Sequence, residues 1–140
     1  MPLNGYSSIC PDHAAKIVSR DKGNPQEHIA NNRASAYVTH YQIDGVVIRQ
    51  GNKCDYLLIN EDTQVAYLIE LKGQDLAWAA KQLEATANTL SLKAKGYKLQ
   101  YRIVANKCAT HEIESSGFKK YRLLWKRDLK YKSQKLEENI

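Results

Sequence analysis

The stretch from Cys54 to Gly73, CDYLLINEDTQVAYLIELKG, decides the fold of this 140-residue chain. It contains two apolar runs of strand length, Cys54–Ile59 and Val65–Leu71, with a polar connection between them. Both runs are apolar at alternate and at intervening positions, which is typical of strands buried on both faces. The pattern therefore predicts a hairpin at the centre of a sheet.

Three charged residues, Asp55, Glu70 and Lys72, lie within this apolar stretch. If residues 61–64 form a four-residue loop, Asp55 falls directly opposite Glu70 on the antiparallel partner strand. Directly opposite side chains share a face and have Cβ atoms about 5 Å apart, and Lys72 returns to that face two residues after Glu70. A register shift of one residue would turn Asp55 to the other face.

Two carboxylates at this spacing repel each other. At about 5 Å and an effective dielectric constant near 20, the repulsion is on the order of 3 kcal/mol. The Lys72 ammonium relieves part of it, whereas a divalent cation relieves it fully. Mg²⁺ or Mn²⁺ is commonly held by one or two carboxylates, waters and substrate phosphate. We therefore expect Asp55, Glu70 and the backbone carbonyl of Leu71 to bind the metal.

This residue set favours phosphodiester hydrolysis. A metal acidifies a bound water and neutralises phosphate charge, while Lys72 orients or deprotonates the water or stabilises developing charge. The alternative is an ordinary buried ion pair between Lys72 and Glu70 or Asp55. Three charges inside otherwise apolar central strands favour a functional site over that alternative.

Length and composition predict one soluble globular domain, residues 1–140, with 43% hydrophobic and 26% charged residues. No apolar run approaches the ~18 residues of a membrane span, and the N-terminus lacks the features of a signal peptide. Cys10, Cys54 and Cys108 show no CxxC spacing. We therefore expect reduced thiols and a cytoplasmic location rather than disulfides or a zinc site.

The rest of the chain predicts a mixed α/β domain around a small central sheet. Asn24, Pro25 and Glu27 have the pattern of a helix N-terminus. The expected elements are helices at 12–20 and 24–36, strands at 37–48, 54–59 and 65–71, a helix at 75–95, strands at 97–105 and 121–125, and a frayed helix over the last dozen residues.

Charge is distributed unevenly along the chain. The net charge is +6, and residues 117–140 contribute most of it, with eight basic and three acidic residues. Aromatic residues are interleaved with these charges: Phe118, Tyr121, Trp125 and Tyr131. This combination suits a nucleic-acid surface, because phosphates bind cations and bases stack on rings. A solvated charged face that keeps the domain soluble is the alternative.

The chain resembles the PD-(D/E)xK, or restriction-endonuclease-like, nuclease superfamily in two segments, GNKCD at residues 51–55 and YLIELKG at residues 67–73. The resemblance covers roughly residues 24–105, including the order helix, three strands, helix, strand. It implies an αβββαβ core with a central mixed β-sheet of about four to five strands flanked by helices. Cys54 stands where the name-giving proline of the family would be.

The resemblance also assigns roles to residues. It implies that Asp55 and Glu70 bind the metal and that Lys72 is the catalytic lysine. Members often use a further Glu from the first helix, for which Glu27 is the candidate. The alternative is that Glu27 completes a capping box with Asn24.

The predicted helix at 75–95 carries further candidates. In similar nucleases this helix often holds a Gln near the site, and Gln82 is either that residue or a polar residue at the rim of the apolar stripe. For Trp78 and Trp125 we favour packing over base stacking.

Together these expectations describe a small Mg²⁺- or Mn²⁺-dependent endonuclease that hydrolyses phosphodiester bonds in DNA, of a resolvase-like or a phage- or defence-related kind. DNA is the expected partner, gripped by the basic segment 117–140, with no membrane partner. A symmetric homodimer would supply two sites for two strands. Two alternatives stay open: a nucleic-acid-binding or interaction module that keeps the fold without cutting, and a ribonuclease toxin.

Overall fold

The structure is a computed structural model that describes residues 3–71, 73 and 75–140. Its elements are β1 (Lys16–Arg20), β2 (Glu27–Asn31), β3 (Val38–Gln42), β4 (Tyr56–Asn60), β5 (Val65–Leu71), α1 (Leu76–Thr89), β6 (Lys98–Ala105), α2 (Thr110–Ile113), α3 (Ser116–Trp125), the short 3-10 helix η1 (Lys126–Asp128), β7 (Leu129–Ser133) and β8 (Lys135–Asn139). The chain is therefore an α/β protein, as its sequence predicts. Within the described ranges, no helix is both long and apolar enough to cross a membrane.

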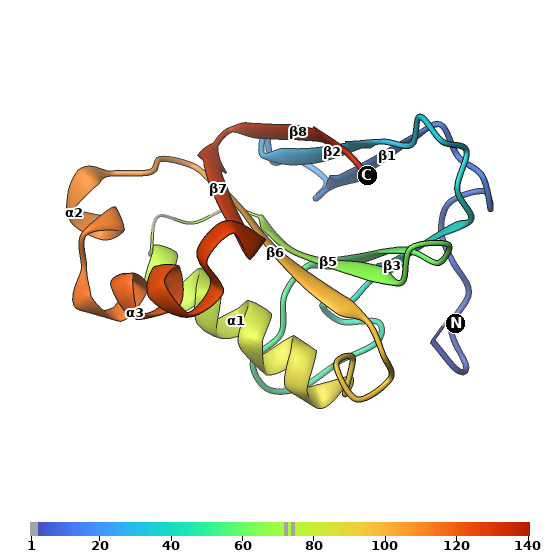
Figure 1. The fold of residues 1–140 in the computed structure, drawn as a ribbon. Coiled ribbons are helices and arrows are strands. Elements are labelled where there is room, and N and C mark those ends of the chain that lie inside the picture. Colours follow the sequence, from blue (N-terminus) through green and yellow to red (C-terminus); the bar gives the residue numbers. More distant parts are fainter. Residues whose placement is uncertain (1–2, 72, 74) are drawn as a thin grey trace.

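Over the described residues the strands form two sheets, a five-stranded sheet in the order β3-β4-β5-β6-β7 and a three-stranded sheet in the order β1-β2-β8. Strands β3, β4 and β5 are antiparallel neighbours, whereas β5, β6 and β7 run parallel. Parallel neighbours need crossover connections, which α1 and the α2–α3 segment supply. Figure 1 shows these helices against one face of the five-stranded sheet and the three-stranded sheet over the other.

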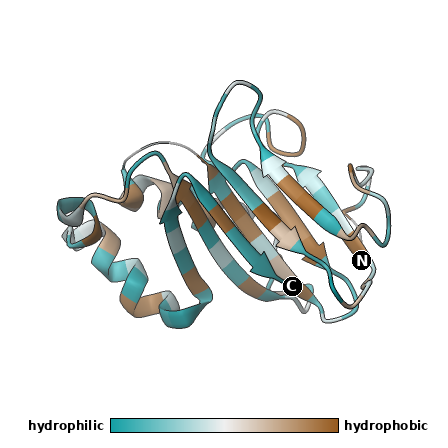
Figure 2. Cartoon of the chain, turned by 90° about the horizontal axis from the view of Figure 1, so that it is seen from above, coloured by the Kyte–Doolittle hydropathy of each residue, from teal (hydrophilic) through white to brown (hydrophobic). Residues whose placement is uncertain are grey.

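The central strands are buried on both faces, as the apolar runs predict. Every residue of β4 is buried. Because successive side chains alternate between the faces, Leu57 and Leu68 pack in the core beneath α1, whereas Leu58 and Ile69 pack in the core between the two sheets. Figure 2 shows this as hydrophobic segments side by side on neighbouring strands. Both faces of the hairpin are thus packed in a hydrophobic core.

The register predicted for the hairpin is confirmed. Asn60 pairs with Val65 and Tyr56 pairs with Ile69 in antiparallel fashion. The helix predicted at 75–95 is also present, although it ends at Thr89. Its start is fixed by Asp75, whose carboxylate accepts a hydrogen bond from the backbone N–H of Trp78 at 2.9 Å.

The helix predicted at 24–36 is wrong, because residues 27–31 form β2. Strand β2 pairs antiparallel with β1 and parallel with β8. His28 and Ala30 on this strand have no exposed surface, since they face the five-stranded sheet. Capping residues are a weak signal that such long-range pairing overrides. The first helix of the expected αβββαβ order is therefore missing, while the order β3-β4-β5-α1-β6 is present.

The strand predicted at 121–125 is also wrong, because these residues belong to α3. The Ser115 hydroxyl caps this helix by accepting a hydrogen bond from the Phe118 N–H at 3.3 Å. Phe118, Tyr121 and Trp125 recur at helical spacing, and all three are buried. That spacing outweighs the strand propensity of the aromatic residues.

Two predictions at the chain ends are wrong as well. The helix predicted at 12–20 contains strand β1 instead, and the last dozen residues form β7 and β8 rather than a frayed helix. Strand β7 extends the five-stranded sheet beside β6, and β8 completes the three-stranded sheet beside β2. Both C-terminal strands find their partners far away in sequence, so local patterns do not reveal them.

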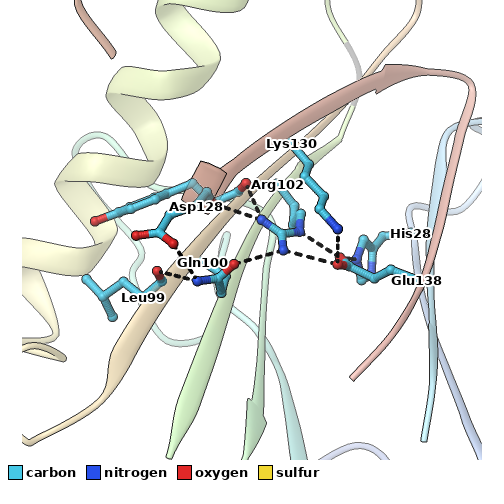
Figure 3. A network of polar contacts seen from close by, with 8 residues as sticks. His28, Leu99, Gln100, Arg102, Asp128, Lys130 and Glu138 are labelled. Carbon is cyan, nitrogen blue, oxygen red and sulfur yellow. Dashed lines mark hydrogen bonds and ion pairs between the residues drawn. The ribbon is translucent and has the colours of Figure 1, made fainter. Parts of the chain in front are cut away.

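A buried charge network joins the two sheets (Figure 3). The Arg102 guanidinium on β6 donates to both carboxylate oxygens of Glu138 on β8, from Nε at 2.7 Å and from a terminal nitrogen at 3.1 Å. His28 Nε2 lies 2.7 Å from the same carboxylate. The pKa of Glu138 falls to about 2: burial alone would raise it, but the hydrogen bonds from His28 and Arg102 and the guanidinium charge outweigh burial.

Candidate active site

Asp55 and Glu70 come together at one end of the β4–β5 hairpin. Asp55 directly precedes β4, and Glu70 is the penultimate residue of β5. Continuing the observed register by one residue places them opposite each other, as the sequence predicts. Both are buried, with 4% and 7% of their surface exposed, respectively, and both line the same cavity. Since Leu57 and Leu68 on the same face lie beneath α1, the two acids also point to the helix side.

The backbone of β5 holds the carboxylate of Asp55. The N–H of Leu71 donates to Asp55 Oδ2 at 2.8 Å. In an extended strand the N–H and C=O of one residue point to the same side. The Leu71 carbonyl, which the sequence predicts as a metal ligand, therefore points to the same side of β5 as the N–H that bonds to Asp55.

The two acids open into a cavity of about 240 Å³, here called the acidic cavity. The hairpin forms one wall and the first turns of α1 form another. Its lining residues are Asp44, Lys53, Asp55, Glu70, Gly73, Asp75, Trp78, Ala79 and Gln82. Four of these described residues carry carboxylates and one is a lysine.

Gln82 lies within the acidic cavity rather than beyond its rim. Its Oε1 is buried and has no hydrogen-bond partner among the described residues. A buried acceptor without a donor is costly, so this oxygen is suited to a donor that enters the cavity, such as an ordered water. Of the two interpretations of Gln82, its position favours the one near the site.

Helix α1 is tied to the start of β4 next to the acids. The Thr86 hydroxyl accepts a hydrogen bond from the Cys54 N–H at 2.7 Å and donates to the Gln82 carbonyl oxygen at 3.1 Å. Complete burial raises the pKa of the Cys54 thiol far above its ordinary value. The thiol therefore stays protonated and packs in the core as an apolar side chain would.

Gly73, after β5, is held by a residue that follows the neighbouring strand. Gly73 has φ +85°, in the left-handed region that favours glycine, and its carbonyl oxygen accepts the N–H of Asn106 at 2.9 Å. Asn106 follows β6, and its side-chain oxygen accepts Gln26 Nε2 at 3.2 Å. Gly73 is thus held through Asn106 by residues that flank β6 and β2.

Of the remaining predicted site residues, Lys72, the predicted catalytic lysine, falls outside the described residues, and Glu27 lies elsewhere. Glu27 begins β2 in the three-stranded sheet, where its register partners are Arg20 and Lys135. It is neither a helix residue nor part of the lining of the acidic cavity, and the capping-box interpretation is wrong along with the helix.

The structure adds residues that the sequence analysis did not place at the site. Asp44 and Lys53 line the acidic cavity, and Lys53 Nζ lies 3.8 Å from Asp44 Oδ1. Trp78 is 49% exposed and also lines the cavity, so the packing interpretation of this tryptophan is wrong. The sequence contains one signal for the position of Trp78: it is four residues from Gln82, so the two side chains share a helix face.

The basic segment 117–140 divides into two kinds of residue. Seven of its eight basic side chains are exposed, and Arg122 is half-buried. Phe118, Tyr121 and Trp125 are buried, and the Trp125 ring stacks on Tyr101 at a centroid distance of 3.7 Å. These three rings are core residues rather than stacking surfaces, whereas most of the basic side chains face solvent. For Trp125, the packing interpretation is confirmed.

Among the described residues, no three His, Cys, Asp or Glu side chains converge closely enough to form a metal-binding group. The acid pair at the cavity is thus a pair and not a triad. Comparison of the chain with protein-family models, with curated proteins and with solved structures finds no match in any of the three.

Proposed function

We propose that the protein is a metal-dependent endonuclease that hydrolyses phosphodiester bonds in DNA. One observation carries this proposal: Asp55 and Glu70, although buried in apolar strands, share one face and line one cavity beneath the start of α1. Paired carboxylates in a cavity are a common arrangement for holding a divalent cation beside phosphate. We also propose that β3-β4-β5-α1-β6 corresponds to the βββαβ part of a restriction-endonuclease-like core.

Mg²⁺ or Mn²⁺ fits the residues present. Both ions take oxygen ligands and often use one or two protein carboxylates, leaving the other positions to waters and phosphate. Asp55, Glu70 and the Leu71 carbonyl would hold the ion. The buried Gln82 Oε1, which no described residue contacts through a hydrogen bond, supports this fit, because water bound to a cation is a strong hydrogen-bond donor. The metal would supply a more acidic water and neutralise charge on the phosphate.

The chain's own residues orient the reaction. The Leu71 N–H fixes the rotamer of Asp55, so that one carboxylate oxygen is already engaged before a ligand arrives. Gln82 Oε1 would accept a hydrogen bond from a donor on the helix side of the cavity. Lys72, which directly follows Leu71 in the sequence, is proposed to deprotonate or orient the attacking water or to stabilise charge on the phosphate.

Substrate choice follows from charge. The net charge of +6 and the exposed basic side chains of residues 117–140 favour a polyanion. We propose a homodimer, so that two sites meet two strands. The free thiols of Cys10, Cys54 and Cys108 support a reducing, cytoplasmic location.

The test is cleavage of supercoiled plasmid with Mg²⁺ or Mn²⁺, with a structured RNA in parallel. The expected result is nicking by the wild type and none by Lys72→Ala, with DNA binding retained in the variant. Lys95→Ala is the charge-matched control, since Lys95 is exposed beyond the far end of α1. Absence of cleavage by the wild type overturns the enzyme, and equal cleavage by wild type and Lys72→Ala overturns the role of Lys72. Cleavage confined to RNA overturns the DNA assignment.

A further inference from the structure

A second cavity adjoins the acidic cavity. It has a volume of about 230 Å³ and lies between α1 and α3. Its lining residues besides Asp75 are Ala77, Trp78, Lys81, Gly117, Lys120 and Tyr121, and this cavity is here called the lysine groove. Asp75 and Trp78 line both cavities. The two cavities therefore meet at these two residues.

The two helices that form the groove are held close together. A Cβ on Gly117 of α3 would lie 3.2 Å from the Ala77 Cβ on α1, a tight contact. The Tyr121 hydroxyl of α3 also donates to Glu84 Oε1 of α1 at 3.0 Å. The groove is therefore a built feature with fixed walls, and Figure 1 shows α3 beside α1.

Each wall of the groove presents a lysine next to an aromatic ring. The Lys81 Nζ lies 5.9 Å from the centroid of the Trp78 ring, and the Lys120 Nζ lies 4.8 Å from the centroid of the Tyr121 ring. Cation–π contacts of this kind limit where the ammonium groups can move. Both lysines are exposed, so they remain able to bind anions.

Trp78 differs from the other tryptophan of the chain. Trp125 is buried in a stack with Tyr101 and Tyr121, whereas half of Trp78 faces solvent. The exposed part of the Trp78 ring is therefore available to a ligand that enters either cavity. An exposed ring that lines one cavity together with two lysines matches the stacking surfaces of proteins that bind single-stranded nucleic acid, where rings hold bases and cations hold the backbone.

We propose that Trp78 stacks on an unpaired base beside the phosphate in the acidic cavity, while Lys81 and Lys120 bind neighbouring phosphates. The inference rests on the proposed function and names its substrate class: DNA with a single-stranded segment at the cut. A paired base in a duplex has both faces covered by its neighbours and cannot stack on Trp78.

The test measures binding without metal, by fluorescence anisotropy of labelled DNA in EDTA, so that no metal-dependent cleavage interferes. Trp78→Ala is expected to weaken binding of a single-stranded oligonucleotide about five- to a hundredfold and to change binding of a blunt duplex less than about twofold. Trp78→Phe keeps a ring and is expected to retain most of the affinity. Equal losses on both DNAs, or no loss, overturn the inference.

The lysines are tested by salt dependence. Lys81→Ala and Lys120→Ala are each expected to lower the slope of log affinity against log salt by about one, whereas Lys95→Ala leaves the slope closer to that of the wild type. Unchanged slopes in both groove variants would overturn the role of the groove.

Intrinsic fluorescence gives a second readout on Trp78. In a Trp125→Phe background Trp78 is the remaining tryptophan, and stacking is expected to quench it on binding a single-stranded oligonucleotide. An oligonucleotide whose bases are replaced by abasic sites should bind without this quenching. Equal quenching by both oligonucleotides would overturn stacking.

These results separate the groove from the nuclease. Loss of single-strand binding in Trp78→Ala supports the groove even if no DNA is ever cut, an outcome that overturns the proposed function alone. Metal-dependent cutting combined with unchanged binding by Trp78→Ala overturns the groove alone.

Discussion

The backbone N–H of Leu71 donates to Asp55 Oδ2 at 2.8 Å, so the main chain of β5 holds the acid that precedes β4. The contact binds the two strands of the hairpin at the point where Glu70 also enters the acidic cavity. A buried carboxylate that accepts a backbone N–H keeps one geometry. The site is therefore set by the strand pairing itself.

The first prediction concerns the charge of Asp55. Asp55→Asn retains an oxygen that can accept the Leu71 N–H but removes the charge that would bind a cation. We expect the protein to stay folded and the rate of plasmid cleavage to fall by at least ~100-fold, because metal-assisted stabilisation is worth several kcal/mol.

Asp62→Asn is the matched control for this variant. Asp62 also accepts a backbone N–H, that of Tyr37 at 3.2 Å, but it lies in the loop at the other end of the hairpin. Cleavage rates that fall equally in both variants would contradict the assignment of Asp55.

The second prediction concerns metal binding without activity. Mn²⁺ should raise the melting temperature, because a ligand that binds the folded state adds about 2.7 kcal/mol of stability at a hundredfold excess over its dissociation constant. Differential scanning calorimetry should show this shift in the wild type but not in Asp55→Asn or Glu70→Gln. A shift of the same size in all three proteins would place the metal elsewhere.

The third prediction separates stability from activity at Gln82. Gln82→Met keeps the length of the side chain and removes a buried oxygen for which the described part of the chain offers no hydrogen-bond donor. We expect the free energy of unfolding to stay level or to rise by up to about 1 kcal/mol, while cleavage slows about tenfold or more. Urea unfolding and plasmid cleavage check the two halves, and a variant that is both unstable and active would refute the role.

The fourth prediction concerns the buried charge network. Arg102 and Glu138 have only 2% and 8% of their side chains exposed, so Arg102→Met leaves a buried carboxylate without its main partner. Unfolding in urea should show a loss of about 3–5 kcal/mol. Lys130→Met is the control: its ammonium also contacts Glu138, at 3.5 Å, but is 54% exposed, so the loss should stay below about 1 kcal/mol.

The fifth prediction concerns pH. Burial, with a smaller contribution from the charge of His28, lowers the pKa of His40 to about 4. The unfolded chain therefore binds a proton at His40 between pH 6.5 and 4 that the folded chain does not, and stability falls as the pH is lowered through this window. The full effect is about 3 kcal/mol.

Urea unfolding at intervals from pH 7 to pH 4 checks this dependence. In His40→Gln the slope should flatten, because an amide does not titrate. The amide can still bond to the Ser19 hydroxyl, which lies 2.8 Å from the ring Nε2 in the wild type. His13→Gln, at an exposed position, should keep the slope of the wild type. A wild-type slope in His40→Gln would contradict the assignment.

The hairpin and α1 were predictable because their signals are local. A four-residue connection between two apolar runs fixes the register of Asp55 against Glu70, and the Asp75 cap with a stripe of apolar residues fixes α1. The same reasoning failed at Glu27, where a good capping pattern belongs to a strand. Its partners in β1 and β8 outweigh the local preference.

The lysine groove was not predictable, for a related reason. It forms only because Gly117 lets α3 approach Ala77 on α1, and nothing near Trp78 in the sequence indicates which element will lie beside it. The aromatic residues of α3 show the opposite case. Their pattern suited a nucleic-acid surface, but Phe118 and Tyr121 are buried in the core. Tertiary placement decides which rings are exposed.

The parallel pairing of β2 with β8 has a consequence for synthesis. His28 and Glu138 bond across 110 positions of the chain, so at about 5–20 residues per second the ribosome needs roughly 5–20 s to deliver the second after the first. Throughout that interval one edge of β2 has no neighbour, and open strand edges pair readily with those of other nascent chains. The speed of translation through the codons between β2 and β8 thus sets how long this edge stays open to aggregation in each newborn molecule.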